Sequence, residues 1–223
     1  MQKQPFPYIV PVCKDNIDIL YEDDYLLLIN KPAFLLSMPG RHPKNKDSVI
    51  TRLKLGYPSA SLVHRLDLDT SGIMIIPKTK VVHADISKQF QMRKVDKTYI
   101  AVVDGLVAQS EGEINLPLKK DWPRPPLQKV CHVEGKASLT QFSVLDRNTT
   151  TKETRLSLTP LTGRTHQLRL HCKAIGHPIL GCDLYADDNT FNKSKRLLLH
   201  AKAIVFVHPV TKKKMEGWCE VPF

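Results

Sequence analysis

Short apolar runs separated by polar turns dominate the chain and predict many strands with few helices. Residues 17–30 form two such runs around the polar turn 22–24, and Pro32 ends the second run. Further strands are expected at 61–63, 73–76, 97–103, 138–146, 154–161 and 197–207. In 154–161 apolar and polar residues alternate, which indicates one buried face. The pattern predicts an α+β fold with a mixed, largely antiparallel central sheet and flanking helices and loops.

Three helices are expected between these strands. The first covers 48–55, and the second begins after Thr79, which can cap it, with Val82, Ile86 and Phe90 on its inward face. The third begins near Thr165 and continues through 175. Its positive end would add to the charge of a preceding Arg, so an anion is favoured there.

Two polar loops stand between buried elements and are the first candidates for chemistry. One is His64-Arg65-Leu66-Asp67-Leu68-Asp69-Thr70-Ser71-Gly72, and the other is Thr162-Gly163-Arg164-Thr165-His166-Gln167-Leu168-Arg169-Leu170-His171. A rigid scaffold often carries its functional residues on such connections. The plain alternatives are a structural ion pair between Arg65 and Asp67, and a solvated helix start at Arg164 and Arg169. The loops alone leave both interpretations open.

Two further segments are polar and rich in proline. Residues 37–46 form a loop that carries Arg41, His42, Lys44 and Lys46. Residues 119–129 form a loop of mixed charge around Trp122, which suits a nucleic-acid contact and a structural crossing equally well.

The charge balance changes which partners are expected. Lys and Arg number 33 against 22 Asp and Glu, a formal net charge of +11, and this excess favours a polyanion such as nucleic acid. With 42% hydrophobic residues in 223, the chain can bury a substantial core. A basic protein with no nucleic-acid function has the same composition, so charge alone does not decide between them.

Cysteine usage and hydropathy indicate a reducing, cytoplasmic location without a membrane partner. The five cysteines are scattered and include no Cys-x-x-Cys pair, so neither a disulfide framework nor a zinc ribbon is expected. The first seven residues lack the apolar core of a signal peptide, and no run reaches the roughly 20 apolar residues of a membrane span. A metal site is not predicted, because the spacing of the potential ligands fits no known ligand pattern; these are His166, His171, His177 and Cys182.

Three ordered motifs make the chain resemble the RluA family of pseudouridine synthases. His64-Arg65-Leu66-Asp67 with Thr70-Ser71-Gly72 fits the family's first signature, Lys97-Thr98-Tyr99-Ile100-Ala101 its second, and the segment 162–169 its third. Asn30-Lys31-Pro32 and Leu198-Leu199-His200-Ala201 fit flanking segments, so the resemblance runs from about residue 20 to the C-terminus. One departure is that Cys182-Asp183 follows Gly181, where relatives often have Asp directly after the glycine.

The resemblance implies the pseudouridine synthase fold and an isomerase that converts uridine to pseudouridine in RNA. The loop Ser37-Met38-Pro39-Gly40-Arg41 and Asp121-Trp122-Pro123 are most similar to members that act on both 23S rRNA and tRNA. The resemblance also implies one catalytic domain over 17–223 after an extension over 1–16, with no separate N-terminal RNA-binding domain. A monomer is expected, and the reaction requires no cofactor and no metal.

The same resemblance assigns roles to individual residues. Asp67 is the nucleophile, which attacks the uracil ring or the ribose C1′, or else helps to expel the uracil, and the residues do not choose among these routes. Arg164 and Tyr99 are the other expected catalytic residues. Arg164 is expected to pair with Asp67 and keep it charged, and Tyr99 to stack on the base near the proton that is removed from C5. The expected substrate-binding residues are Arg65, which fills the place of the flipped base, together with His64, Leu198, Gln167 and Arg169.

Two alternatives remain at this point. Asp67 and Asp69 could be the carboxylate pair of a glycosidase, but both are tied to one loop and would not face each other across a sugar. A non-catalytic RNA-binding or ribosome-assembly protein fits the composition as well as an enzyme does. An acid on the RNA-binding surface has no use in such a protein, so Asp67 separates the two interpretations.

Overall fold

The computed structural model describes residues 8–223, so the first seven residues of the predicted extension 1–16 lie outside the described part. By its internal contacts the chain divides into two compact units. The first contains the residues up to Asp96 together with Ala201–Pro222, and the second contains Lys97–His200 and Phe223. β-strands outnumber helices, and the sheet is mixed and mostly antiparallel, which confirms the predicted α+β class.

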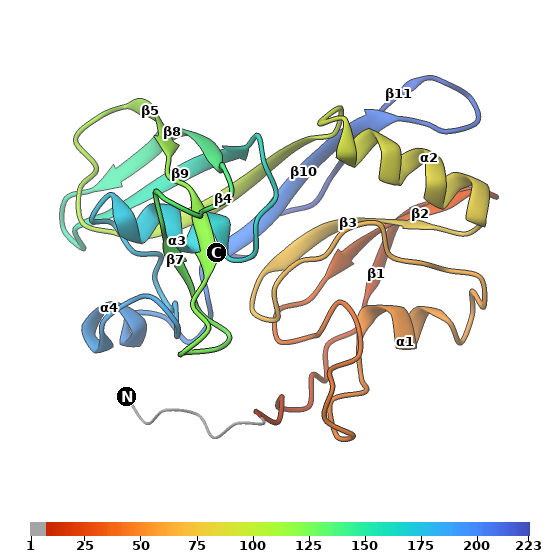
Figure 1. Ribbon diagram of the computed structural model, residues 1–223, viewed down its shortest axis with the longest axis horizontal. Helices are drawn as coiled ribbons and strands as arrows, with labels where there is room; N and C mark the ends of the chain where they lie inside the picture. The colour runs from red at the N-terminus through yellow and green to blue at the C-terminus, as the bar shows by residue number, and fades with distance from the viewer. Residues whose placement is uncertain (1–7) are drawn as a thin grey trace. The chain divides into compact units, whose positions relative to one another are not determined.

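The first unit is a strand ladder with a helix on each face (Figure 1). Its strands are β1 (Asp18–Glu22), β2 (Leu26–Lys31), β3 (Ser71–Pro77), β10 (Leu199–Val207, which begins in the second unit) and β11 (Lys214–Trp218). Their order is β1-β2-β3-β10, and β11 pairs with β10. The helices are α1 (Val49–Leu53) and α2 (Lys80–Gln91). All seven residues of β3 are buried, because one helix covers each side of the ladder.

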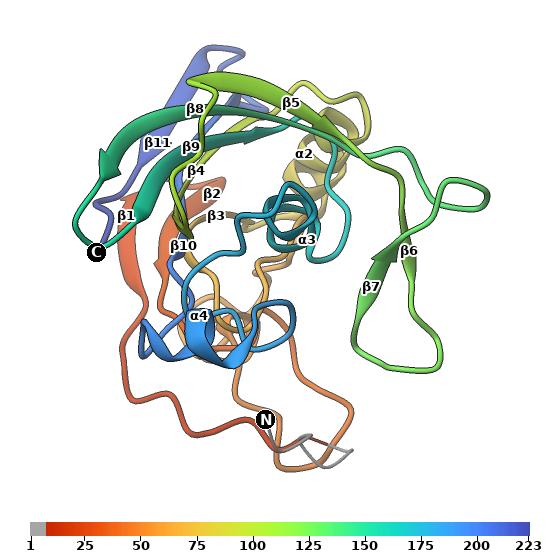
Figure 2. The same cartoon turned by 90° about the vertical axis from the view of Figure 1, so that its left-hand side faces the viewer.

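The second unit is a curved antiparallel sheet that holds a helix against one face, as Figure 2 shows. Its strands are β4 (Asp96–Asp104, whose first residue closes the first unit), β5 (Glu111–Asn115), β8 (Leu139–Asn148) and β9 (Glu153–Pro160), in the order β4-β9-β8-β5. The short strands β6 (Leu118–Lys120) and β7 (Gln128–Val130) form a separate hairpin. Two helices follow, α3 (Gln167–Ala174) and α4 (Asp188–Asn192). Buried leucines of α3 and β9 share one core cluster.

Most predicted elements are present near their expected bounds. The hairpin 17–30 is β1 and β2, whose pairing is antiparallel. Thr79 caps α2, because its side chain accepts a hydrogen bond from the Val82 backbone N–H, and Val82 and Ile86 are buried as expected. In β9 the buried residues alternate as the pattern predicted. The periodicity of apolar residues predicted an element correctly wherever that element has one buried face.

Three predictions were wrong or incomplete. Residues 61–63 are not a strand, since Ser61 instead donates its backbone N–H to Pro77 O and contacts His83 through its hydroxyl group. Part of the expected loop 119–129 is paired, because β6 and β7 form a ladder across it. The helix α3 begins at Gln167 and not near Thr165, because His166 before it adopts the left-handed conformation, with φ 55°.

The sequence pattern missed β5, β11 and α4, each of which has five residues. Short elements of this kind show too few periods of alternation to stand out from a loop. In the part of the chain that the structure describes, no helix is long and apolar enough to span a membrane.

Candidate active site

The loop that carries Asp67 is held on both sides of the aspartate by buried side chains of the first unit. Ser37 donates its hydroxyl proton to the Leu66 carbonyl oxygen at 2.7 Å and accepts the Leu66 N–H at 3.1 Å. Lys31 donates from Nζ to the Leu68 carbonyl oxygen at 3.1 Å. The residues before and after Asp67 are therefore both fixed, which limits the motion of the aspartate backbone.

Lys31 is an unusual anchor, because a lysine at the end of a buried strand is fully enclosed, with 0% of its surface exposed. Besides Leu68, its ammonium group donates to the carbonyl oxygens of Pro32 at 2.9 Å and Leu35 at 2.8 Å. Hydrogen bonds of this number offset the cost of burying the charge. The loop closes with a turn in which Thr70 donates its N–H to Asp67 O.

Gly72 ends the loop where no other residue fits. Its φ of 120° is strained for residues with a side chain, and a Cβ atom there would lie 2.3 Å from the Ala201 carbonyl oxygen of β10. The chain can therefore enter β3 directly beside β10, which sets the position of the loop above the sheet of the first unit.

The three predicted site residues of this loop have different surroundings. Arg65 is exposed, and its Nη1 donates to the Met38 sulfur at 3.5 Å. Asp67 is half-buried. His64 accepts the Ile75 N–H on Nε2 at 2.9 Å and stacks on Phe90 with 4.8 Å between ring centroids. These contacts support a positioning role for His64, while its predicted contact with substrate stays a prediction.

The second polar loop, in the second unit, is held by Gln167, the first residue of α3. The Gln167 Oε1 accepts from the Thr162 hydroxyl group at 2.8 Å and from the Arg164 N–H at 3.0 Å. Its Nε2 donates to Leu139 O and to Thr140 Oγ1, both at 3.0 Å. All four hydrogen bonds that an amide side chain can readily make are thus used within the unit. This geometry supports Gln167 as an anchor for Arg164.

The two arginines of this loop are also placed differently. Arg164 is half-buried, and its Nε donates to Ala137 O at 3.2 Å. Arg169 is only 2% exposed and forms an ion pair with Asp183. Its guanidinium group also donates to the Cys182 sulfur at 3.4 Å, so the departure Cys182-Asp183 supplies two acceptors for one buried arginine. The contacts support a structural role for Arg169.

The remaining predicted residues lie on adjacent segments of the second unit. Tyr99 is on β4, opposite Leu158 of β9, and is half-buried. Leu198 precedes β10, and its carbonyl oxygen accepts the N–H of Val102 from β4 at 3.1 Å. Both side chains pack against the same core cluster. Their proximity agrees with a shared base-binding role, and the pairing of Asp67 with Arg164 stays a prediction.

Two anchors of the Asp67 loop, Lys31 and Ser37, were missed as site residues. Asn30-Lys31-Pro32 matches a segment of the family. A lysine at the end of an apolar strand also indicates that the lysine has buried partners. Ser37 gave no signal, because a serine in a polar loop is ordinary.

Two other places in the described part of the chain were expected or found to hold polar groups, and neither fits the chemistry sought. The three histidines that could be metal ligands each contact other protein groups. His166 contacts Tyr185, and His177 contacts Asp104. His171 contacts Thr140 and Leu116. Among residues 8–223 no group of three metal-ligating side chains is found.

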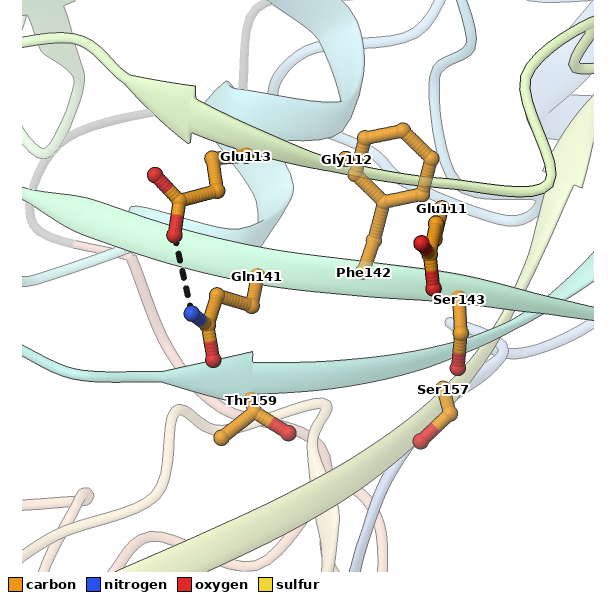
Figure 3. Close-up of a pocket in the computed structure, with 8 residues that line it drawn as sticks. All are labelled: Glu111, Gly112, Glu113, Gln141, Phe142, Ser143, Ser157 and Thr159. Carbon is orange, nitrogen blue, oxygen red and sulfur yellow. Dashed lines mark hydrogen bonds between the residues drawn. The ribbon is translucent and has the colours of Figure 1, made fainter.

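Figure 3 shows a hollow on the polar face of β5, β8 and β9, in which Glu113 accepts a hydrogen bond from Gln141. No predicted site residue lines this hollow. Its two glutamates, Glu111 and Glu113, would repel a polyanion, so it is not the expected RNA site.

The fold is one that RNA pseudouridylate synthases have, as comparison with known proteins shows. A sequence profile of the RNA pseudouridylate synthase family matches residues 25–174, and the chain belongs to this family. The family's reaction makes it an isomerase that acts on RNA.

Several curated relatives are similar over nearly the whole chain. A Yersinia pestis protein named dual-specificity RNA pseudouridine synthase RluA is 46% identical over 205 residues, which cover 92% of this chain and 99% of the relative. The Escherichia coli K12 protein of the same name is 44% identical over 197 residues, or 88% of this chain and 90% of the relative. Among solved structures, human RNA pseudouridylate synthase domain containing 1 superposes with a TM-score of 0.80 at 27% identity, covering 96% of this chain and 86% of that one.

Proposed function

We propose that this chain isomerises specific uridines to pseudouridine in 23S rRNA and in tRNA anticodon stem-loops, as a cytoplasmic monomer with Asp67 as its nucleophile. The observation that carries the proposal is the fixed backbone on both sides of Asp67, whose neighbours Leu66 and Leu68 are held by buried side chains. An acid on a fixed backbone in a strongly basic protein suits attack on a nucleoside better than phosphate binding. The relatives' names, which say dual-specificity RNA pseudouridine synthase, support two kinds of RNA substrate.

The reaction keeps every atom of the nucleotide except for one exchanged proton. The bond from the ribose C1′ to uracil N1 breaks, a bond from C1′ to C5 forms, and the proton on C5 is lost while N1 gains one. Asp67 attacks the ring or C1′, or assists the departure of uracil, and the geometry is compatible with each of these routes.

The other residues divide the remaining work. Arg164 keeps Asp67 ionised and oriented, and Tyr99 and Leu198 enclose the uracil. Unstacking the uridine costs roughly a few kcal/mol, which protein contacts must offset. Arg65 is suited to occupy the vacated place, because it is exposed next to Asp67 and held by a weak contact to Met38.

The test is the variant Asp67→Ala with purified protein and unmodified transcripts of 23S rRNA and tRNA. We expect RNA affinity within about threefold of the wild type and no pseudouridine, because the nucleophile is absent while the basic surface is intact. A non-catalytic RNA-binding protein would instead form no product in the wild type either, and its affinity would rise when the acid is removed. Product formed by Asp67→Ala would contradict the proposal.

A further inference from the structure

The loop 37–46 of the first unit is the feature that the proposed function leaves unused, and it lies beside Asp67. Ser37 holds both backbone groups of Leu66, and the Met38 sulfur accepts from Arg65. The loop is therefore joined to the Asp67 loop at two successive residues. The first two residues of the loop 37–46 therefore lie against the Asp67 loop.

The loop is built as a rigid platform. Its turn is closed by the Gly40 N–H on Asn45 O at 2.6 Å and by the Asn45 N–H on His42 O at 2.9 Å. Lys46 adds a contact from Nζ to Gly40 O at 3.1 Å. Downstream, the Ile50 N–H of α1 donates to Ser37 O, so the helix holds the start of the loop as well.

Residues 8–10 also bind this turn through hydrogen bonds to Asn45. The Asn45 side chain, which is 9% exposed, donates to Tyr8 O at 2.7 Å and accepts the Val10 N–H at 2.9 Å. Arg52 of α1 donates to the carbonyl oxygens of Cys13 and Asp15. A loop with this many contacts has a fixed backbone, so less backbone entropy is lost when a ligand binds to it.

The exposed face of the platform is cationic. Arg41, Lys44 and Lys46 are exposed, and residues 37–46 contain no acid. The nearest acid in sequence, Asp47, is paired with Arg52 at 2.7 Å. With Arg65, which contacts Met38 of the loop, this makes four positive charges, which suit consecutive phosphates of an RNA strand.

We propose that residues 37–46 form a second RNA-binding element, in which Arg41 and Lys44 contact phosphates of the strand that carries the target uridine. The inference rests on the proposed function, because it places these phosphates next to the nucleotide that Asp67 attacks. Phosphate contacts of this kind set the register of the RNA and contribute affinity without reading sequence.

The experiment compares two double variants with equal net charge. Arg41→Gln with Lys44→Gln removes the proposed contacts, and Lys80→Gln with Lys88→Gln removes two exposed lysines of α2, on the opposite face of the sheet (Figure 1). Each change lowers the formal net charge from +11 to +9, since two cations are lost. A third variant, Arg41→Lys with Lys44→Arg, keeps both charges.

Binding to an unmodified tRNA transcript is measured over a salt series around 0.1 M, and the single-turnover rate is measured at saturating enzyme. For Arg41→Gln with Lys44→Gln we expect a Kd about 10-fold higher and a salt slope shallower by about 1.5, with the rate within about twofold. The α2 variant and the charge-keeping variant are expected to bind within about twofold of the wild type.

Two results would overturn the inference. One is equal binding by the loop variant and the α2 variant, and the other is a loss by the charge-keeping variant as large as that of the neutral one. If the wild type itself forms no pseudouridine, the proposed function fails. If the wild type forms pseudouridine but the loop variant and the α2 variant bind RNA equally well, only the proposed RNA-binding element is rejected.

Discussion

The two polar loops are both held rigid, but by different kinds of contact. Gln167 lies within its own motif and anchors Arg164 three residues before it. The Asp67 loop depends on Lys31 and Ser37, which lie about 30 residues earlier in the chain. The motif therefore contains the anchoring side chain of the second loop, which is itself held by Leu139 and Thr140, and lacks the anchoring side chains of the first loop. Changes outside a motif can then disturb a catalytic loop as strongly as changes inside it.

The largest difference between the loops is expected at their glycines. Gly72→Ala would place a Cβ atom 2.3 Å from Ala201 O at a positive φ, whereas a Cβ atom at Gly163 would meet nothing within 4 Å. We expect Gly72→Ala to lose roughly 4 kcal/mol or more of unfolding free energy and Gly163→Ala to change it by less than about 0.5 kcal/mol. Chemical denaturation measures both. Similar losses in the two variants would mean that the loops do not differ in this way.

The next effect concerns the buried lysine. Lys31→Met leaves the carbonyl oxygens of Pro32, Leu35 and Leu68 without this donor in a site that water does not reach. We expect a loss of roughly 2–3 kcal/mol in stability and a slower single-turnover rate, because the residue after Asp67 is released. Gln167→Leu is the corresponding change in the second loop, because it also replaces a buried polar anchor by an apolar side chain. A stable Lys31→Met variant with the wild-type rate would show that the lysine does not support the site.

We expect the second unit to lose stability as the pH falls, because of its buried histidines. Burial, with a contribution from Arg196, lowers the pKa of His200 to about 4, and burial also lowers the pKa of His171, whose partner Thr140 binds Gln167. Both histidines are neutral in the folded chain, while the unfolded chain takes up protons near pH 6.5. Their contribution to the free energy of unfolding is therefore complete above about pH 6.5 and decreases as the pH falls below it.

For His200 this loss amounts to up to roughly 3 kcal/mol between pH 6.5 and its folded pKa of about 4. Denaturation at several pH values measures the slope, and the variant His200→Gln should show a smaller one. A slope that is the same in wild type and variant would contradict this assignment.

The smallest effect is expected at Ser37 and concerns rate more than folding. Ser37→Ala leaves the Leu66 N–H and carbonyl group without their hydroxyl partner. We expect the single-turnover rate to fall about 10-fold with RNA affinity within about twofold, because a small displacement of a nucleophile is costly. Ser37→Thr, which keeps the hydroxyl group, should recover most of the rate.

Ser48 provides the control for Ser37, because it caps α1 with its hydroxyl group and is equally buried. Ser48→Ala should lose about 1 kcal/mol of stability without slowing the reaction. An equal rate loss in the two alanine variants would indicate that Ser37 acts only through stability.

The comparison also shows what a sequence can predict. The motif residues, the α+β class and the elements with one buried face were found because each has a local pattern, as in β9 and α2. The anchors Lys31 and Ser37 depend on contacts between distant residues, which no local pattern reports. The contacts of Gln167 and Arg169 were not predicted either, because a motif shows that a side chain is needed but not whether its partner is substrate or protein.

The most direct test of the account maps pseudouridines in the 23S rRNA and tRNA of cells that lack this protein and are complemented with either the wild type or Asp67→Asn. This variant has nearly the same size as the wild type but no carboxylate nucleophile. We predict that the wild type restores pseudouridine at specific positions in both RNA classes and that Asp67→Asn, at an equal protein level, restores none. Restoration by Asp67→Asn would contradict the central claim that Asp67 is the nucleophile.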